Sequence, residues 1–202
     1  MKRINRISII VILAGILVTS CATTSISFLN NPEIKLSSFN KIMVFAPFQD
    51  ISWRKSMESY FVEEFTKKGK NAVSSLEIVS PLKTYTDEEF NALLANAGID
   101  AVISIIVVDA YTDQAYIPQT STTTGSARAY GNTVYGQSRT TTSGGYYVSK
   151  PRVKFEVNLF ERTTGTLAWK ATAFTAGNAF ADTNTLFRSL ATKVVEEYVI
   201  QP

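Results

Sequence analysis

The chain has one thiol, and its surroundings favour a reaction at that position. Cys21 is the only cysteine of the 202 residues. It follows a basic start and an apolar run at 7–18, which is shorter than the roughly 20 residues that span a bilayer and is typical of a signal peptide. Signal peptidases need small side chains beside the bond they cut, and acyl transfer needs a nucleophilic thiol at the new N-terminus. The sequence therefore predicts cleavage between Ser20 and Cys21, with a lipid on Cys21.

The segment Leu17-Val18-Thr19-Ser20-Cys21 resembles the lipobox of bacterial lipoproteins. Leu17 and Val18 stand at its aliphatic positions, Ser20 at its small position and Cys21 at its acylated position. The alternative is an ordinary secretory signal with a chance cysteine. Two or three acyl chains on one residue give stable anchoring. If the source is Gram-negative, the resemblance further implies the outer membrane, facing the periplasm, because no Asp follows the cysteine. For any other source, the resemblance does not specify which membrane holds the lipid.

Without its signal peptide the chain is neutral, and it has no histidine. The whole sequence has 20 Lys and Arg, 17 Asp and Glu, and no His. Residues 1–20 hold three of the basic groups and no acid, so basic and acidic side chains balance beyond them. This balance gives no electrostatic reason to expect a nucleic-acid partner. With Cys21 acylated and no His, we expect no cofactor, no metal site and no enzymatic activity.

The apolar periodicity predicts one α+β domain at 41–202, after a signal peptide at 1–20 and a lipidated, irregular tether at 21–40. A strand-helix-strand-helix-strand order implies right-handed crossovers and a parallel start to the sheet. An antiparallel hairpin and a C-terminal helix follow, which makes a mixed sheet in a two-layer or three-layer sandwich. The expected strands are 41–47, 71–75, 101–108, 153–159 and 167–173, and the expected helices are 52–68, 87–97 and 183–198.

Two apolar patterns predict the core. In the first helix, one stripe is apolar and is expected inside, while charged residues, including Arg54 and Glu58, occupy the other faces. The run at 101–108 is almost entirely Val, Ile and Ala, which predicts a strand covered on both faces. The apolar stripe comprises Trp53, Met57, Tyr60, Phe61 and Phe65.

The segment at 118–149 differs from the rest in composition. It is rich in Thr, Ser, Gly and Tyr, has no acid, and has only two charged residues, both arginines, before Lys150. We expect a polar hairpin, with its turn at 130–133, or a loop. Tyrosine among small polar residues is compatible with a recognition surface; the alternative is an edge hairpin kept soluble by its polar side chains. A membrane-spanning hairpin is disfavoured, because few apolar side chains are available for a lipid-facing side. The candidate partner-binding residues are Arg128, Tyr130, Tyr135, Arg139, Tyr146 and Tyr147.

Three acids at or near the ends of predicted strands raise the hypothesis of a divalent-ion or polar-ligand site. Asp50 and Asp109 come just after two strands expected to be parallel, and ligands bind at the carboxyl ends of such strands. Asp113 lies close by in sequence. The simpler interpretation, a helix cap at Asp50 and solvated loop residues elsewhere, is preferred.

Four segments together resemble periplasmic lipoproteins related to the curli-secretion channel and to the lipoprotein activator of penicillin-binding proteins. They are KIMVFAPFQD, FTKKG, GIDAVISIIVVDAY and VNLFERTTGTLAWKA. The resemblance implies an α+β fold similar to anticodon-binding domains. Clearly amphipathic membrane hairpins, which the curli channel has, are missing. We expect a non-catalytic, lipid-anchored binding or scaffold module for an envelope protein or a cell-wall component; the alternative is a subunit of an oligomeric secretion or export assembly.

Overall fold

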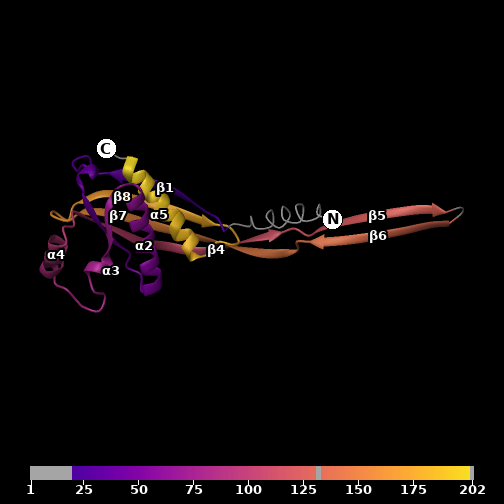
Figure 1. Ribbon diagram of the computed structural model, residues 1–202, viewed down its shortest axis with the longest axis horizontal. Coiled ribbons are helices and arrows are strands. Elements are labelled where there is room, and N and C mark those ends of the chain that lie inside the picture. Colours follow the sequence, from indigo (N-terminus) through magenta and orange to yellow (C-terminus); the bar gives the residue numbers. More distant parts are fainter. Residues whose placement is uncertain (1–19, 131–132, 201–202) are drawn as a thin grey trace, which may run out of the picture.

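The structure is a computed structural model that describes residues 20–130 and 133–200, without the side chains at 127–136. Figure 1 shows a body of sheet and helices and a long two-stranded arm that leaves one end of it. The elements are β1 (Ala22–Asn30), a 3-10 turn (Leu36–Ser38), β2 (Lys41–Phe45), α2 (Ile51–Lys67), β3 (Asn71–Ser74), α3 (Ser75–Ile78), α4 (Asp87–Asn96), β4 (Ala101–Ile117), β5 (Thr120–Tyr130), β6 (Thr133–Ser143), β7 (Tyr146–Glu161), β8 (Leu167–Gly177) and α5 (Thr183–Ile200).

Six strands form one mixed sheet in the order β1-β8-β7-β4-β2-β3. β2 is parallel to both β3 and β4, as the two crossovers require. The remaining three pairs are antiparallel: β4 with β7, β7 with β8, and β8 with β1. The α+β class with a mixed sheet and a C-terminal helix is thus confirmed.

Helices cover the two faces of the sheet unequally. α2 and α5 lie on one face over the main core, where Tyr198 donates to the Leu36 carbonyl at 2.9 Å. Side chains alternate along a strand, so Met43 of β2 points away from its neighbours Ile42 and Val44. Met43 packs instead with Leu94 and Ile99 in a small second core beneath α4.

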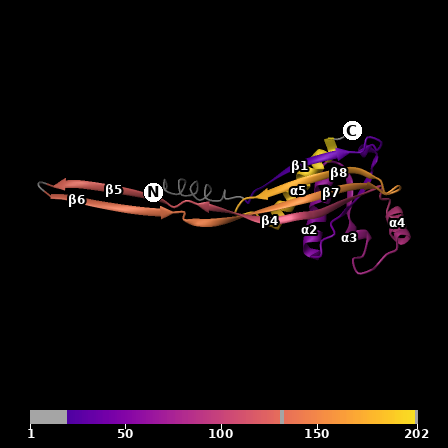
Figure 2. The ribbon, with the colours of Figure 1, turned by 180° about the vertical axis from the view of Figure 1, so that it is seen from behind.

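Local capping signals set where the helices begin. The Asp50 carboxylate accepts from the backbone N–H groups of Ser52 and Trp53 at the start of α2. Thr86 and Glu89 form the reciprocal capping box that opens α4. Because β2 and β4 both run toward the arm and α2 follows β2, α2 begins at the arm end of the body. α5 follows β8 and begins at that end too, in agreement with Figure 2.

The expectation of an irregular tether is wrong for its first half. Ala22–Asn30 forms β1, paired with β8 from Ala22 opposite Gly177 to Asn30 opposite Trp169. Its alternate residues Thr24, Ile26 and Phe28 turn toward the body, where Thr24 is buried and the other two pack on the main core. The Asn178 N–H donates to the Cys21 carbonyl at 2.9 Å. Cys21 therefore lies directly before β1 and is bonded to the segment that follows β8.

β4 continues nine residues beyond the predicted 101–108 and becomes one strand of the arm. The predicted cover on both faces is found only in part: Ala101, Ile103 and Ile105 on one face are fully buried, Val102 and Ser104 on the other face are half-buried, and residues 106–108 are exposed. β8 ends at Gly177. Beyond that point β4 and β7 continue as a two-stranded ladder, which ends at the pair Ile117 and Tyr146. β5 and β6 then extend the ribbon as a separate two-stranded ladder (Figure 1). We call residues 112–151 the arm.

Candidate functional site: the arm and the groove at its root

The arm contains all six predicted partner-binding residues. Tyr146 and Tyr147 are exposed on β7, and the Tyr147 ring lies 5.1 Å from the Tyr116 ring across the ladder. Arg139 is exposed on β6 and is paired with Thr124. The backbones of Arg128 and Tyr135 face each other near the distal end, where Tyr130 ends β5. The side chains of Arg128, Tyr130 and Tyr135, and residues 131–132 of the predicted turn, lie outside the described part.

The described part of β5 and β6 is polar on both faces. Hydroxyl pairs join the strands, with Ser121 3.1 Å from Thr142 and Thr123 2.9 Å from Thr140. Within the described residues the two strands pair only with each other, so both outer edges present unpaired backbone donors and acceptors. Such edges are ready to pair with another chain.

The β4–β7 ladder and the β5–β6 ladder of the arm are connected by two short segments, 118–119 and 144–145, which we call the joint. Gly144 has φ +86°, and a Cβ there would lie 2.0 Å from the Pro118 carbonyl oxygen. The adjacent Gly145 N–H donates to the Ile117 carbonyl at 2.7 Å. Only glycine fits this close crossing of the two connecting segments.

Arg152 fixes the root of the arm to the body. Its Nε lies 3.0 Å from the Asp113 carboxylate, and its Nη1 donates to the Gly177 carbonyl at 2.9 Å. Asp50 caps α2, and the Ser52 hydroxyl, as the main cause, lowers the pKa of its carboxyl. Asp109 is exposed beside a bulge of β4. No group of three potential metal ligands occurs among the described residues.

An apolar groove of about 640 Å³ lies in the corner between the arm root and the helix ends. Loop and helix residues before and within the first turns of α2 and α5 form one wall, and β4 and β7 form the floor. Trp53, predicted to lie in the core, is 52% exposed and lines this groove, because it sits in the first turn of α2 at the end of the body. No pattern in the sequence indicates the groove, whose lining includes Phe48, Trp53, Val107, Tyr111, Leu186 and Phe187.

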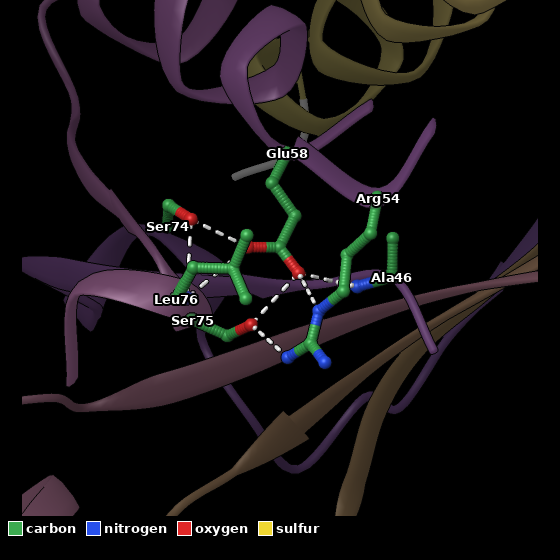
Figure 3. A network of polar contacts seen from close by, with 6 residues as sticks. All are labelled: Ala46, Arg54, Glu58, Ser74, Ser75 and Leu76. Atoms are coloured by element: carbon green, nitrogen blue, oxygen red, sulfur yellow. Dashed lines mark hydrogen bonds and ion pairs between the residues drawn. The ribbon is translucent and has the colours of Figure 1, made fainter. Parts of the chain in front are cut away.

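Arg54 and Glu58, predicted on outer faces of α2, are both buried, and Figure 3 shows their polar contacts. Glu58 is 0% exposed, and its Oε1 accepts from Arg54 Nε at 3.0 Å, Ser75 Oγ at 2.7 Å and the Ala46 N–H at 3.1 Å. Arg54 also donates to Ser75 Oγ at 2.8 Å. The ion pair thus ties α2 to the segment after β2 and to the start of α3.

The second oxygen of Glu58 is satisfied as well. It accepts from Ser74 Oγ at 2.5 Å and from the Leu76 N–H at 3.4 Å. The Arg54 guanidinium lies 5.1 Å from the centre of the Phe45 ring. Because the Glu58 carboxylate is fully paired and enclosed, it fixes the positions of these segments and is not accessible to a substrate.

Ser20 and Cys21, the predicted cleavage pair, are exposed at the arm end of the body. Ser20 Oγ lies 2.7 Å from Thr185 Oγ1 in the first turn of α5. The Cys21 thiol is free and exposed. Residues 1–19 lie outside the described part, and none of the helices within it is long and apolar enough to cross a membrane.

Several solved structures are similar to this chain at low sequence identity. A PelC dodecamer from Paraburkholderia phytofirmans is 12% identical with a TM-score of 0.52, over 89% of this chain and 100% of that one. A point variant of the same protein is 13% identical with the same score and coverage. Lipoprotein GNA1162 from Neisseria meningitidis is 15% identical with a TM-score of 0.42, over 78% of this chain and 96% of that one. No protein-family model and no curated protein matches the chain. The likeness to PelC shows a common fold.

Proposed function

We propose that this chain is a non-catalytic module of the cell envelope, anchored by a lipid on Cys21, that binds its partner through the arm. The observation that carries the proposal is the arm itself, a polar ribbon with unpaired edges on a well-packed body. An isolated two-stranded ribbon is at best marginally stable, and ordering its residues costs conformational entropy. Binding to another molecule would stabilise the arm and would account for its presence.

The arm suits a polar partner such as an envelope protein or a cell-wall component. Tyr116 and Tyr147 offer aromatic surface near its root, and hydroxyl side chains follow along β5 and β6. Tyrosine loses little conformational entropy on binding, and small hydroxyl residues adapt their hydrogen bonds. Edge pairing would add affinity from the backbone.

A non-catalytic role agrees with the side chains available. The chain has no His, which removes the most common general base. Glu58 is enclosed, Asp50 caps a helix, and Asp113 is paired with Arg152. These carboxylates have structural partners in place of a substrate.

The position of Cys21 supports direct anchoring of the body. β1 begins at the next residue, so a lipid on Cys21 would hold the body beside the bilayer, here proposed to be the outer membrane on its periplasmic side. A Cys21→Ala form should move from the membrane fraction to the soluble fraction, and mass spectrometry of the parent should show the acyl mass on Cys21. Retention of the variant in the membrane fraction would contradict lipid anchoring.

Site-specific photocrosslinking tests whether the arm makes the contact. A photoreactive residue replaces Tyr147 on the arm or, as a matched control, Leu82, which is 95% exposed on the body. We expect a discrete adduct in native envelopes from the Tyr147 position and none from the Leu82 position. Equal adducts from both positions, or none from Tyr147, would contradict the proposal.

A second candidate function is a subunit of an oligomeric secretion or export assembly. Two observations favour it: the free edges of the arm, and the dodecameric form in which PelC, a protein of this fold, was solved. In that case the partner of the arm is another copy. Particles purified in mild detergent should be closed rings by electron microscopy; monomers at the same concentration would rule this candidate out.

A further inference from the structure

The apolar groove at the arm root has no role in the proposed function. Its two charged residues are already engaged: Asp50 caps α2, while Arg152 is bonded to Asp113 and to the Gly177 carbonyl. The rest of the lining is mainly aromatic and aliphatic, with Gln49, Thr112 and Thr183 as its uncharged polar residues. A surface of this kind favours a narrow apolar molecule over a polar one.

The predicted lipid site lies at the same end of the body as the groove. The first turn of α5 separates them, with Thr183 and Leu186 lining the groove and Thr185 contacting Ser20 next to Cys21. The segment that leads into this turn begins at Asn178, whose N–H holds the Cys21 carbonyl, and it exposes Phe180. Passing around one helix end requires about 10 Å, the helix diameter, which a long acyl chain can span.

We propose that the groove holds one acyl chain of the lipid carried by Cys21. The proposal rests on the lipid anchoring proposed above. The chain would leave Cys21, pass the exposed Phe180 and lie over Val107 and Tyr111, against Trp53. Burial of methylene groups there would add to the contact between body and anchor.

Tryptophan fluorescence tests the chemistry of the groove. The chain has two Trp residues, Trp53 in the groove and Trp169, which is fully buried in the main core. Soluble Cys21→Ala protein is titrated with palmitate that carries a nitroxide on its chain. We expect saturable quenching, and loss of most of it when Trp53→Phe is added.

A matched pair of variants locates the binding. Val107 is 41% exposed and lines the groove, whereas its neighbour Val108 is 54% exposed and does not. Both should tolerate a charge without unfolding, which circular dichroism checks. Val107→Glu should weaken probe binding at least tenfold and Val108→Glu less than twofold. No saturable quenching in the Cys21→Ala protein, or equal losses in both variants, would overturn the inference.

The lipidated protein tests the source of the chain. In detergent it should take up the probe at least tenfold more weakly than the Cys21→Ala form, because its own chain fills the groove. Equal uptake, with the acyl mass present on Cys21, would overturn this inference and leave the anchor intact; absence of the acyl mass would overturn both. If the probe does not bind and Val107→Glu removes a crosslinked protein instead, the groove binds a protein and the acyl-chain inference is wrong.

Discussion

The body and the arm are built from one continuous pair of strands but differ in how their residues are satisfied. In the body, β4 and β7 have neighbours on both sides and helices above them, and even the buried Glu58 has five partners. In the arm, the same strands have only each other, then give way to a ladder of Ser and Thr. The comparison indicates that the packing of the body stabilises the fold, and we assign partner binding to the arm.

The largest expected effect on the body is loss of the buried carboxylate. Glu58→Ala leaves Arg54 buried without its ionic partner and should lower the free energy of unfolding by about 3–5 kcal/mol. Urea denaturation measures this. The control is Glu63→Ala, which removes an exposed ion pair to Lys67 and should leave the free energy of unfolding nearly unchanged, because solvent screens such pairs. Similar losses in the two variants would contradict the assigned role of the network.

The buried Tyr198 should make the body sensitive to high pH. Burial raises the pKa of its hydroxyl from 10.0 to about 12. Since the folded-state pKa exceeds the unfolded one, the stabilisation is fully present below pH 10 and is lost as the pH rises toward 12. The loss amounts to about 3 kcal/mol at about 1.4 kcal/mol per pKa unit.

Unfolding measured between pH 9 and about 12 checks this, with two variants. Tyr198→Phe loses the bond to the Leu36 carbonyl, about 1 kcal/mol at neutral pH, and should flatten the decline at high pH. Tyr147→Phe, which changes an exposed residue of the arm, should keep the parent's decline. A decline that is the same in all three proteins would refute the assignment to Tyr198.

A change at the joint should affect the arm alone. Gly144→Ala places a Cβ against the Pro118 carbonyl and forces a strained backbone, a local cost of about 1–3 kcal/mol. We expect faster amide exchange in β5 and β6 by mass spectrometry, with exchange in the body unchanged. The control is Gly125→Ala, whose Cβ would meet its nearest neighbour at an ordinary 3.7 Å. Faster exchange throughout the body would show that the two regions are not independent.

The sequence predicted most of the order of elements because the signals involved are local. The capping box at Thr86 and Glu89, the cap at Asp50 and the turn at Gly165, where φ is +69°, each act within a few residues. The alternation along β7 and β8 likewise needs no distant partner to be recognised. These features decided the fold class.

What the sequence did not predict depends on distant partners. β1 has a polar composition, and it is a strand because β8 provides pairing about 150 residues further on. Arg54 and Glu58 have the sequence pattern of surface charges. They are buried because the chain at Ala46 and at 74–75 packs around them. Trp53 fits the apolar stripe of α2, yet it lies where the body ends. The groove combines four such segments, so no local pattern indicated it.

Replacing the arm tests the central claim most directly. Ile117 and Tyr146 are paired across the ladder, so residues 118–145 can be replaced by Asn-Gly, a two-residue hairpin turn, while Tyr116→Ser and Tyr147→Ser remove the aromatic pair that stays at the root. The variant should keep the parent's melting temperature within about 2 °C, because no core residue is lost, and it should remain in the membrane fraction. Crosslinking pull-down from native envelopes should recover the partner with the parent and lose it with the variant. Undiminished capture by a stable, membrane-bound variant would contradict the claim that the arm is the binding element.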